Sequence, residues 1–347
     1  MILRLAIIGF GNVGQGFARM LVDKRDWLLK TKGLDVEVVA ISTRSRGSLI
    51  SDRGLDIERV LDLLANGKSL DEYGDEATEC TARQIIDRTI ADMMIELTTL
   101  NIEDGQPAID HISHALSEGM DVVTANKGPI AFAYHDLRTT SRSMGSRFRF
   151  EGTVMDGTPI FSLIEKTLPG CEVIDIRGIL NSTSNYVLTA MTNGRCMKDA
   201  VMEAQAKGIA EADPTLDLDG WDAAAKITAL ANVLMDARMT PRDVDRIGIN
   251  GITAETMNEA ARQDNRIRLV ASASRNNDGV VLQVKPESVS SRSPFWSVNG
   301  TSSAITIRTD LMGELTILET NPELTQTAYA VFSDMLHIVE SIRSGTL

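Results

Sequence analysis

Three glycines in a fixed spacing, directly after the first apolar run, constrain the fold of this chain most strongly. The run covers residues 3–10 and has the composition of a buried parallel strand. It leads into a G-x-G-x-x-G hexapeptide made of Gly9, Phe10, Gly11, Asn12, Val13 and Gly14. Because a helical pattern follows to about residue 29, the glycines allow a tight turn and close approach to a pyrophosphate at a helix N-terminus. We therefore predict a dinucleotide site in this hexapeptide; a plain glycine turn is the alternative.

Strand and helix patterns alternate beyond this motif and predict the fold class. Further buried strands are expected at residues 36–41, 92–97 and 121–125, with a helix at 106–118. This order is typical of a doubly wound parallel sheet. Later strands are expected at residues 148–151, 171–180, 246–252, 266–274, 280–286 and 304–309, and a final helix at 327–342. They indicate a second, mixed sheet.

We therefore expect an α/β protein of two domains. Residues 1–135 would form a Rossmann-type dinucleotide-binding domain, joined by the C-terminal helix within residues 311–347. Residues 136–310 would form an α+β domain with the mixed sheet, for substrate binding and catalysis.

Charge and cysteine usage exclude several classes of partner. The net charge of −13 argues against nucleic acid and anionic membranes. Three widely spaced cysteines give neither a disulfide framework nor a zinc motif and fit a reducing compartment. Because the sequence also lacks a signal-peptide pattern and a membrane-length apolar run, we expect a soluble cytoplasmic protein.

The ends of two predicted strands carry candidate cofactor contacts. Residues 42–47 follow the second strand and contain Arg44 and Arg46 but no carboxylate. Two guanidinium groups suit a ribose 2′-phosphate, whereas NAD sites tend to carry an acid there. NADP is therefore favoured and NAD remains possible; solvated loop charges are the alternative. Thr98 and Thr99 end the strand at 92–97, where hydroxyls could meet the cofactor.

Two lysines are candidate catalytic groups. Lys127 follows the strand at 121–125 and so faces the crevice where ligands of such sheets bind, although a surface lysine is the alternative. Lys226 follows five carboxylates, of which Asp222 lies one helical turn before it. Since the helix around them is apolar on all sides, the lysine is expected to be buried beside carboxylates, as a proton donor would be. Acids that merely decorate a helix N-terminus are the alternative.

Taken together, these pieces resemble homoserine dehydrogenase over essentially the whole chain. The markers are the hexapeptide at 9–14, residues 122–127, residues 178–186 and the acidic run that ends at Lys226. Ser182, Thr183 and Ser184 in the third marker are candidate caps of a following helix. The resemblance implies NAD(P)-dependent interconversion of L-homoserine and L-aspartate 4-semialdehyde, by a homodimer built on the mixed sheet. It also implies a short form without a C-terminal regulatory domain.

The resemblance further implies roles for individual residues. Lys226 would be the proton donor, with Lys127 beside substrate and nicotinamide and Thr98 or Thr99 in contact with the cofactor. The substrate-binding acids would be Glu211, Asp217 and Asp222. A sodium or similar ion would be held, mainly by backbone oxygens, at Glu151, Val154, Asp156 and Thr158.

Two departures from the family pattern leave other functions open. The usual Asn-Gly-Thr is Asn181-Ser182-Thr183, and residues 319–323 replace a glycine-rich loop that would close over the cofactor. A dehydrogenase of another amino alcohol or semialdehyde is one alternative. A non-catalytic metabolite-binding paralogue is the other, because side chains at 319–323 would hinder close backbone approach.

Overall fold

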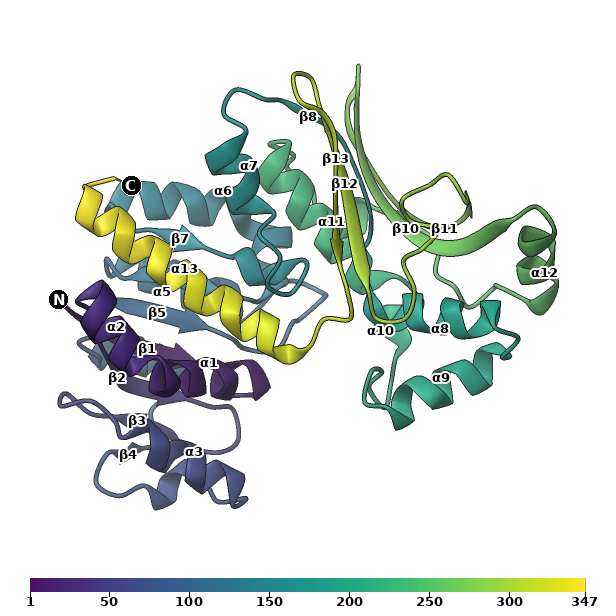
Figure 1. Cartoon of the computed structure of the whole chain (residues 1–347). Coiled ribbons are helices and arrows are strands. Elements are labelled where there is room, and N and C mark those ends of the chain that lie inside the picture. The colour runs from purple at the N-terminus through teal and green to yellow at the C-terminus, as the bar shows by residue number, and fades with distance from the viewer. Residues whose placement is uncertain (347) are drawn as a thin grey trace. The chain divides into compact units, whose positions relative to one another are not determined.

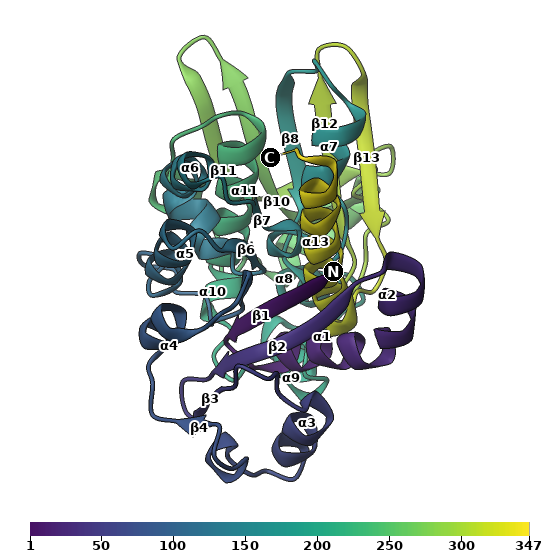
Figure 2. The same cartoon turned by 90° about the vertical axis from the view of Figure 1, so that its left-hand side faces the viewer.

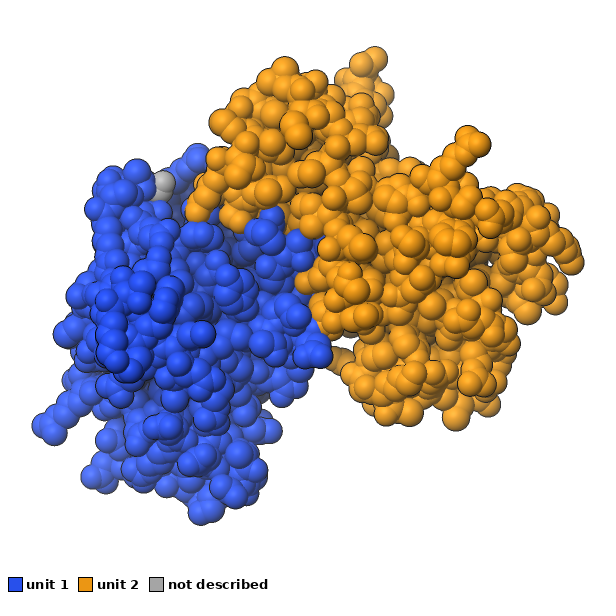
Figure 3. All heavy atoms as spheres, viewed as in Figure 1, with its two compact units in different colours: residues 1–129, 133–159, 323–347 blue, residues 130–132, 160–322 orange. Residues whose placement is uncertain are grey.

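The computed structural model describes residues 1–346, which form two compact units (Figure 3). Unit 1 comprises residues 1–129 and 133–159 and the chain from Glu323 onward, and unit 2 comprises residues 130–132 and 160–322. Within residues 1–346, no helix has the length and apolar character that crossing a membrane requires.

A seven-stranded sheet forms the centre of unit 1. Its strands lie in the order β4-β3-β2-β1-β5-β6-β7, and β2, β1, β5, β6 and β7 are parallel to one another. Their bounds are β1 Ile2–Ile8, β2 Asp35–Ser42, β3 Ser48–Ile50, β4 Ala77–Thr78, β5 Met93–Glu96, β6 Asp121–Thr124 and β7 Phe148–Arg149. The predicted parallel sheet is therefore confirmed, with β3 and β4 as an added antiparallel edge.

Helices cover both faces of this sheet, as Figure 2 shows. They are α1 Asn12–Asp23, α2 Arg25–Lys32, α3 Ile57–Ala65, α4 Ala82–Arg88, α5 Ala108–Ser117, α6 Lys127–Met144 and α13 Leu324–Ser344, with the 3-10 turns η1 Leu70–Glu72 and η2 Glu151–Thr153. Alternate residues of β1 point to opposite faces: Leu5 and Ile7 pack with α1, α3 and α13, whereas Ala6 and Ile8 pack with α4 and α5. The strands are therefore buried on both sides, and this explains their continuous apolar sequences.

Unit 2 is built on a six-stranded mixed sheet in the order β13-β12-β8-β10-β11-β9. The strands are β8 Val173–Ile179, β9 Asp245–Arg246, β10 Asn265–Asn276, β11 Gly279–Ser290, β12 Ser303–Thr309 and β13 Gly313–Glu319. The helices are α7 Phe161–Thr167, α8 Ser182–Thr192, α9 Met197–Ala206, α10 Thr215–Leu218, α11 Trp221–Leu234 and α12 Ala254–Arg262, with the 3-10 turn η3 Pro241–Asp243. Helices α8, α11 and α12 pack against β10 (Figure 1). The predicted mixed sheet is present.

The unit boundaries differ from the expected domain limits at 135/136 and 310/311. Residues 136–159 belong to unit 1, because β7 pairs with β6 and η2 packs against α13. Strand β13 belongs to unit 2, because it pairs along its whole length with β12, and only the chain from Glu323 returns to unit 1.

The expected strand at residues 246–252 is wrong beyond Arg246. There the chain leaves the sheet: the Ile249 N–H donates to the Leu218 carbonyl at 2.8 Å, and a Cβ added to Gly248 would lie 2.4 Å from the same oxygen. Ile249 is buried beside the end of α10 instead of continuing β9, whereas Ile247 is exposed. Strands β3, β4 and β13 and helices α4 and α12 were not predicted.

Candidate active site

The glycine hexapeptide forms the turn between β1 and α1. Gly9 has φ +93°, and a Cβ there would lie 2.5 Å from the Leu97 carbonyl carbon; a Cβ on Gly14 would lie 2.9 Å from the Gly9 oxygen. Both glycines are therefore required by packing within the protein. Gly11 differs, because a Cβ on it would meet no atom of the described chain within 4 Å. The backbone at Gly11 is thus open to a close-approaching ligand.

The N-terminus of α1 suits an anion. Among residues 1–346, no side chain caps the helix at Gly11, and its first turn carries no acidic residue. The first backbone N–H groups of a helix lack partners within the helix, and the helix dipole places partial positive charge there. The chemistry of this turn fits a dinucleotide pyrophosphate.

The loop that carries the two predicted cofactor arginines lies beside this turn. The Gly9 N–H donates to the Ser42 carbonyl at 2.9 Å, so the end of β2 adjoins the glycines. Arg44 and Arg46 are exposed. Their loop is nevertheless fixed, because the Thr43 hydroxyl donates to the Gly47 carbonyl at 2.7 Å and accepts the Arg46 N–H at 2.8 Å. Two cations are therefore presented on an ordered backbone next to the dinucleotide turn.

A buried carboxyl group, Glu96, organises the ends of β5 and β6 and was missed in the sequence. The group accepts hydrogen bonds from the Thr98 N–H at 2.9 Å, from the Thr98 hydroxyl, and from the Thr124 hydroxyl at 2.8 Å. Burial raises the pKa of Glu96 to about 7, and these hydrogen bonds oppose that rise. The signal that could have found it is an acid at the last position of an otherwise apolar strand.

The Glu96 network continues to the start of α6. The Asn126 amide donates to the Thr98 carbonyl at 3.1 Å, and its oxygen accepts the Gly128 N–H at 3.0 Å. Lys127 is the first residue of α6 and lies between Asn126 and Gly128, which this hydrogen bond joins. Thr98 is engaged by Glu96, whereas Thr99 is exposed.

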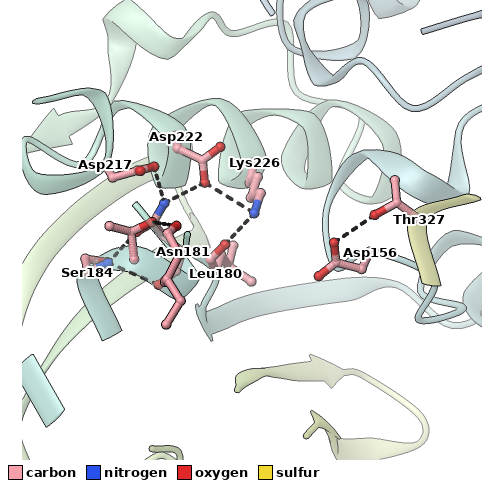
Figure 4. Close-up of polar contacts among 10 residues, drawn as sticks. Asp156, Leu180, Asn181, Ser184, Asp217, Asp222, Lys226 and Thr327 are labelled. Atoms are coloured by element: carbon pink, nitrogen blue, oxygen red, sulfur yellow. Dashed lines mark hydrogen bonds and ion pairs between the residues drawn. The ribbon is translucent and has the colours of Figure 1, made fainter. Parts of the chain in front are cut away.

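In unit 2, the predicted lysine–carboxylate pair lies on α11 (Figure 4). Lys226 Nζ is 3.2 Å from Asp222 Oδ2, and the two side chains are only 17% and 13% exposed. The same ammonium donates to the Leu180 carbonyl at 2.6 Å, just after β8. Asp222 and Lys226 thus share one face of a buried helix, as their spacing predicts, and two oxygens orient the lysine.

Asn181 joins a second carboxylate to this pair. One side-chain nitrogen, Nδ2, donates to Asp217 Oδ1 at 2.7 Å and to Asp222 Oδ2 at 3.0 Å (Figure 4). Its oxygen accepts the Ser184 N–H at 2.8 Å, so Asn181 caps α8, and the prediction of Ser182, Thr183 or Ser184 as the cap is wrong. Burial, and then the negative charge of Asp222, raise the pKa of Asp217.

The other acids of the run lie outside this cluster. Glu211 is exposed, and its side chain has no hydrogen bond or ion pair within the described chain; only its carbonyl is held, by Gln205 at 3.2 Å. Asp213 accepts the Thr215 N–H at the start of α10, and Asp219 bonds Asn250. The structure therefore joins Asp217 and Asp222 to Lys226 but leaves the predicted role of Glu211 without a contact.

The predicted cation loop packs against the start of α13. The Asp156 carboxylate accepts the Thr327 hydroxyl at 2.9 Å (Figure 4), and a Cβ on Gly157 would lie 2.4 Å from the Gln326 oxygen. Glu151 and Val154 are buried, and the Thr158 N–H donates to the Met155 carbonyl at 2.8 Å. The described residues contain no cluster of three His, Cys, Asp or Glu that could hold a metal.

Hydrogen bonds hold the segment at 319–323, which departs from the family pattern. Asn321 has φ +46°, a conformation that glycine adopts most easily, and its N–H donates to the Ser302 hydroxyl at 3.2 Å. Glu323 then forms a capping box with Gln326 at the start of α13. An asparagine therefore takes one left-handed position in place of a glycine.

Two family models match the chain. One is described as homoserine dehydrogenase and matches residues 159–336; the other, its NAD-binding domain, matches residues 9–151. The homoserine dehydrogenase of Methanocaldococcus jannaschii is 38% identical over 98% of this chain and 99% of its own. An NAD(+)-dependent homoserine dehydrogenase of Pseudomonas canavaninivorans is 35% identical over 97% and 96%.

Solved structures are similar over nearly the same length. A putative homoserine dehydrogenase from Archaeoglobus fulgidus has a TM-score of 0.85 at 31% identity and covers 97% of this chain and 99% of that one. A hyperthermophilic archaeal homoserine dehydrogenase in complex with NADPH has a TM-score of 0.83 at 30% identity, with 98% of both chains covered.

Proposed function

The chain belongs to the homoserine dehydrogenase family of NAD(P)-dependent oxidoreductases, and from this premise we propose that it interconverts L-homoserine and L-aspartate 4-semialdehyde. The observation that carries the proposal is the half-buried group of Lys226, Asp222 and Asp217 beside the end of β8. A lysine oriented by two oxygens suits proton transfer, and a pair of carboxylates suits the ammonium group of an amino acid.

The proposed cofactor is NADP, which supplies or accepts the hydride when bound. The open backbone at Gly11 and the N-terminus of α1 would hold its pyrophosphate. The exposed Arg44 and Arg46 would bind the 2′-phosphate that distinguishes NADP from NAD. Because the family includes an NAD(+)-dependent relative, membership alone does not select the cofactor. The two arginines are therefore the reason for favouring NADP here.

Charge balance supports the proposed substrate site. Two carboxylates and one ammonium leave one net negative charge, which the substrate ammonium would neutralise. In the reducing direction, the aldehyde carbon gains the hydride and its oxygen takes a proton from Lys226 Nζ. In the oxidising direction, the neutral lysine accepts the hydroxyl proton. Lys127 would stabilise the negative oxygen, and Glu211 would add a contact from its exposed loop.

Three further proposals come from the family. A monovalent cation such as sodium would bind backbone oxygens at Glu151, Val154 and Thr158, with Asp156 nearby. Two copies of the chain would pair through the six-stranded sheet, where Val281 and Leu318 leave apolar side chains exposed. The protein would act in the cytoplasm.

The segment at 319–323 is the observation that favours the second candidate, a non-catalytic metabolite-binding protein. Activity with L-aspartate 4-semialdehyde distinguishes the enzyme from the non-catalytic protein. The assay compares NADPH with NADH and includes a panel of other small aldehydes as alternative substrates. We expect NADPH-dependent reduction of this semialdehyde in preference to the panel. If NADPH binds in a titration but no aldehyde is reduced, the enzyme proposal fails and the non-catalytic candidate replaces it.

A further inference from the structure

We infer that Asn181 is a positioning residue that fixes the Asp217 and Asp222 carboxylates as a pair without neutralising them. The inference rests on the proposed function, because it assigns these two acids to the substrate ammonium. Asn181 itself would not touch the reacting atoms. Its place in the chain, between β8 and α8, makes it suitable for this role.

Every polar atom of the Asn181 side chain is engaged. Its nitrogen donates to Asp217 at 2.7 Å and to Asp222 at 3.0 Å, and its oxygen accepts the Ser184 N–H at 2.8 Å. The residue is only 5% exposed. An amide has two N–H donors and one acceptor oxygen, so this arrangement fixes its orientation. The carboxylates therefore bond to a group that is itself held by the first turn of α8.

The two carboxylates lie on different helices, and like charges at short range repel each other. Asp217 is on α10 and Asp222 on α11, with the left-handed Gly220 between these helices. Repulsion between the acids would favour their separation, whereas a shared donor holds both. A lysine or arginine at position 181 would also bridge them, but its positive charge would cancel the attraction for a substrate ammonium. A neutral amide bridges the acids and preserves that attraction.

The same junction also positions the lysine. Leu180, the residue before Asn181, accepts the Lys226 ammonium at 2.6 Å, and Lys226 in turn pairs with Asp222 at 3.2 Å. The hydrogen bonds thus close a ring through Lys226, Asp222, Asn181 and the backbone of Leu180. Movement of Asn181 would disturb both the carboxylate pair and the direction of the ammonium.

Two variants test the inference. Asn181→Ser keeps an oxygen that can cap α8 but removes the amide nitrogen that donates to both acids, and Asn181→Asp keeps the size and the cap but adds a third negative charge. Thr253→Ala is the matched control, since Thr253 caps α12 in the same unit far from the acids in sequence. The measurements are the homoserine KM, the NADPH dissociation constant and the pH profile of kcat/KM.

Asn181→Ser is expected to raise the homoserine KM at least about tenfold, the effect of losing one hydrogen bond to a charged group, with NADPH affinity unchanged. The acid limb of the variant's kcat/KM profile should move to higher pH. In the wild type the hydrogen bond from Asn181 opposes the rise in the pKa of Asp217, and the variant lacks it. Asn181→Asp should also raise KM, because its carboxylate repels the two acids that the amide holds together. The control should lower the unfolding temperature and leave KM and the pH profile as in the wild type.

An unchanged homoserine KM and pH profile in folded Asn181→Ser would overturn the inference and leave Asn181 as a helix cap. If that variant does not fold, the same readouts in Asn181→Asp decide. The proposed function has a separate test, because it fails if the wild type does not interconvert L-homoserine and L-aspartate 4-semialdehyde. In an active wild type, only the Asn181 variants bear on the inference.

Discussion

Replacement of Glu96 by glutamine should change how the stability of the protein depends on pH. Glu96 is fully buried, with 0% of its surface exposed, and its pKa rises from an ordinary 4.5 to about 7. Because the folded pKa lies above the unfolded one, the native state favours the protonated acid. Its contribution to stability is complete below pH 4.5 and is lost as the pH rises through 7.

The size of the effect follows from the two pKa values. At ~1.4 kcal/mol for each tenfold change in proton affinity, ionisation of Glu96 at alkaline pH lowers the free energy of unfolding by about 3 kcal/mol. Most of this loss falls between pH 5 and 8. Glutamine has almost the same shape as the protonated acid and does not ionise there, so Glu96→Gln should escape the loss.

The assay is urea unfolding of the wild type and Glu96→Gln between pH 5 and 8, followed by circular dichroism. The two proteins should be close in stability at pH 5, and the variant should be more stable by roughly 2 to 3 kcal/mol at pH 8. Glu118→Gln, an exposed position in the same unit, is the control and should follow the wild type. If the unfolding free energies of the wild type and Glu96→Gln change with pH in the same way, the pKa of Glu96 is not raised by burial.

Two further predictions concern the cofactor site. Gly9→Ala should lower the free energy of unfolding by ~2 kcal/mol or more, because it adds a clash at a residue with positive φ. Gly11→Ala should lower it by ~1 kcal/mol or less but weaken NADPH binding roughly tenfold. If thermal unfolding with and without NADPH shows the same effects for both variants, the distinction between a structural Gly9 and a cofactor-binding Gly11 is wrong. Replacing both Arg44 and Arg46 by alanine should lower the ratio of kcat/KM for NADPH to that for NADH roughly tenfold. Arg53→Ala should leave this ratio unchanged, and an unaltered ratio in the double variant would remove the basis for NADP selection.

Local signals in the sequence predicted the elements that depend mainly on local interactions. The turn at Gly9 to Gly14 lies between an apolar run and a helical pattern, and close packing at Gly9 and Gly14 shows why glycines occur there. The pair Asp222 and Lys226 followed from helical spacing alone. Helix α4 also had a local signal, the capping box of Thr81 and Gln84, which was overlooked.

Other features depend on contacts between distant segments, which no local pattern specifies. The apolar pattern after Arg246 resembles a strand, but packing of Gly248 against α10 removes it from the sheet. Glu96 depends on Thr124 for part of its hydrogen bonding, and Asn181 on acids 36 and 41 residues away. The members of these polar clusters lie in motifs that the sequence shows, but only the fold shows which of them contact one another.

Lys226 is proposed to give and take the proton in the reaction, and Lys226→Ala tests this role directly. The measurement is NADPH-linked reduction of L-aspartate 4-semialdehyde, with NADPH affinity measured on the same sample and Lys198→Ala, an exposed lysine of α9, as control. We expect kcat to fall by roughly a hundredfold or more without the proton donor, while NADPH affinity and the control enzyme stay at wild-type values. Turnover by Lys226→Ala at the wild-type rate would show that Lys226 is not the proton donor.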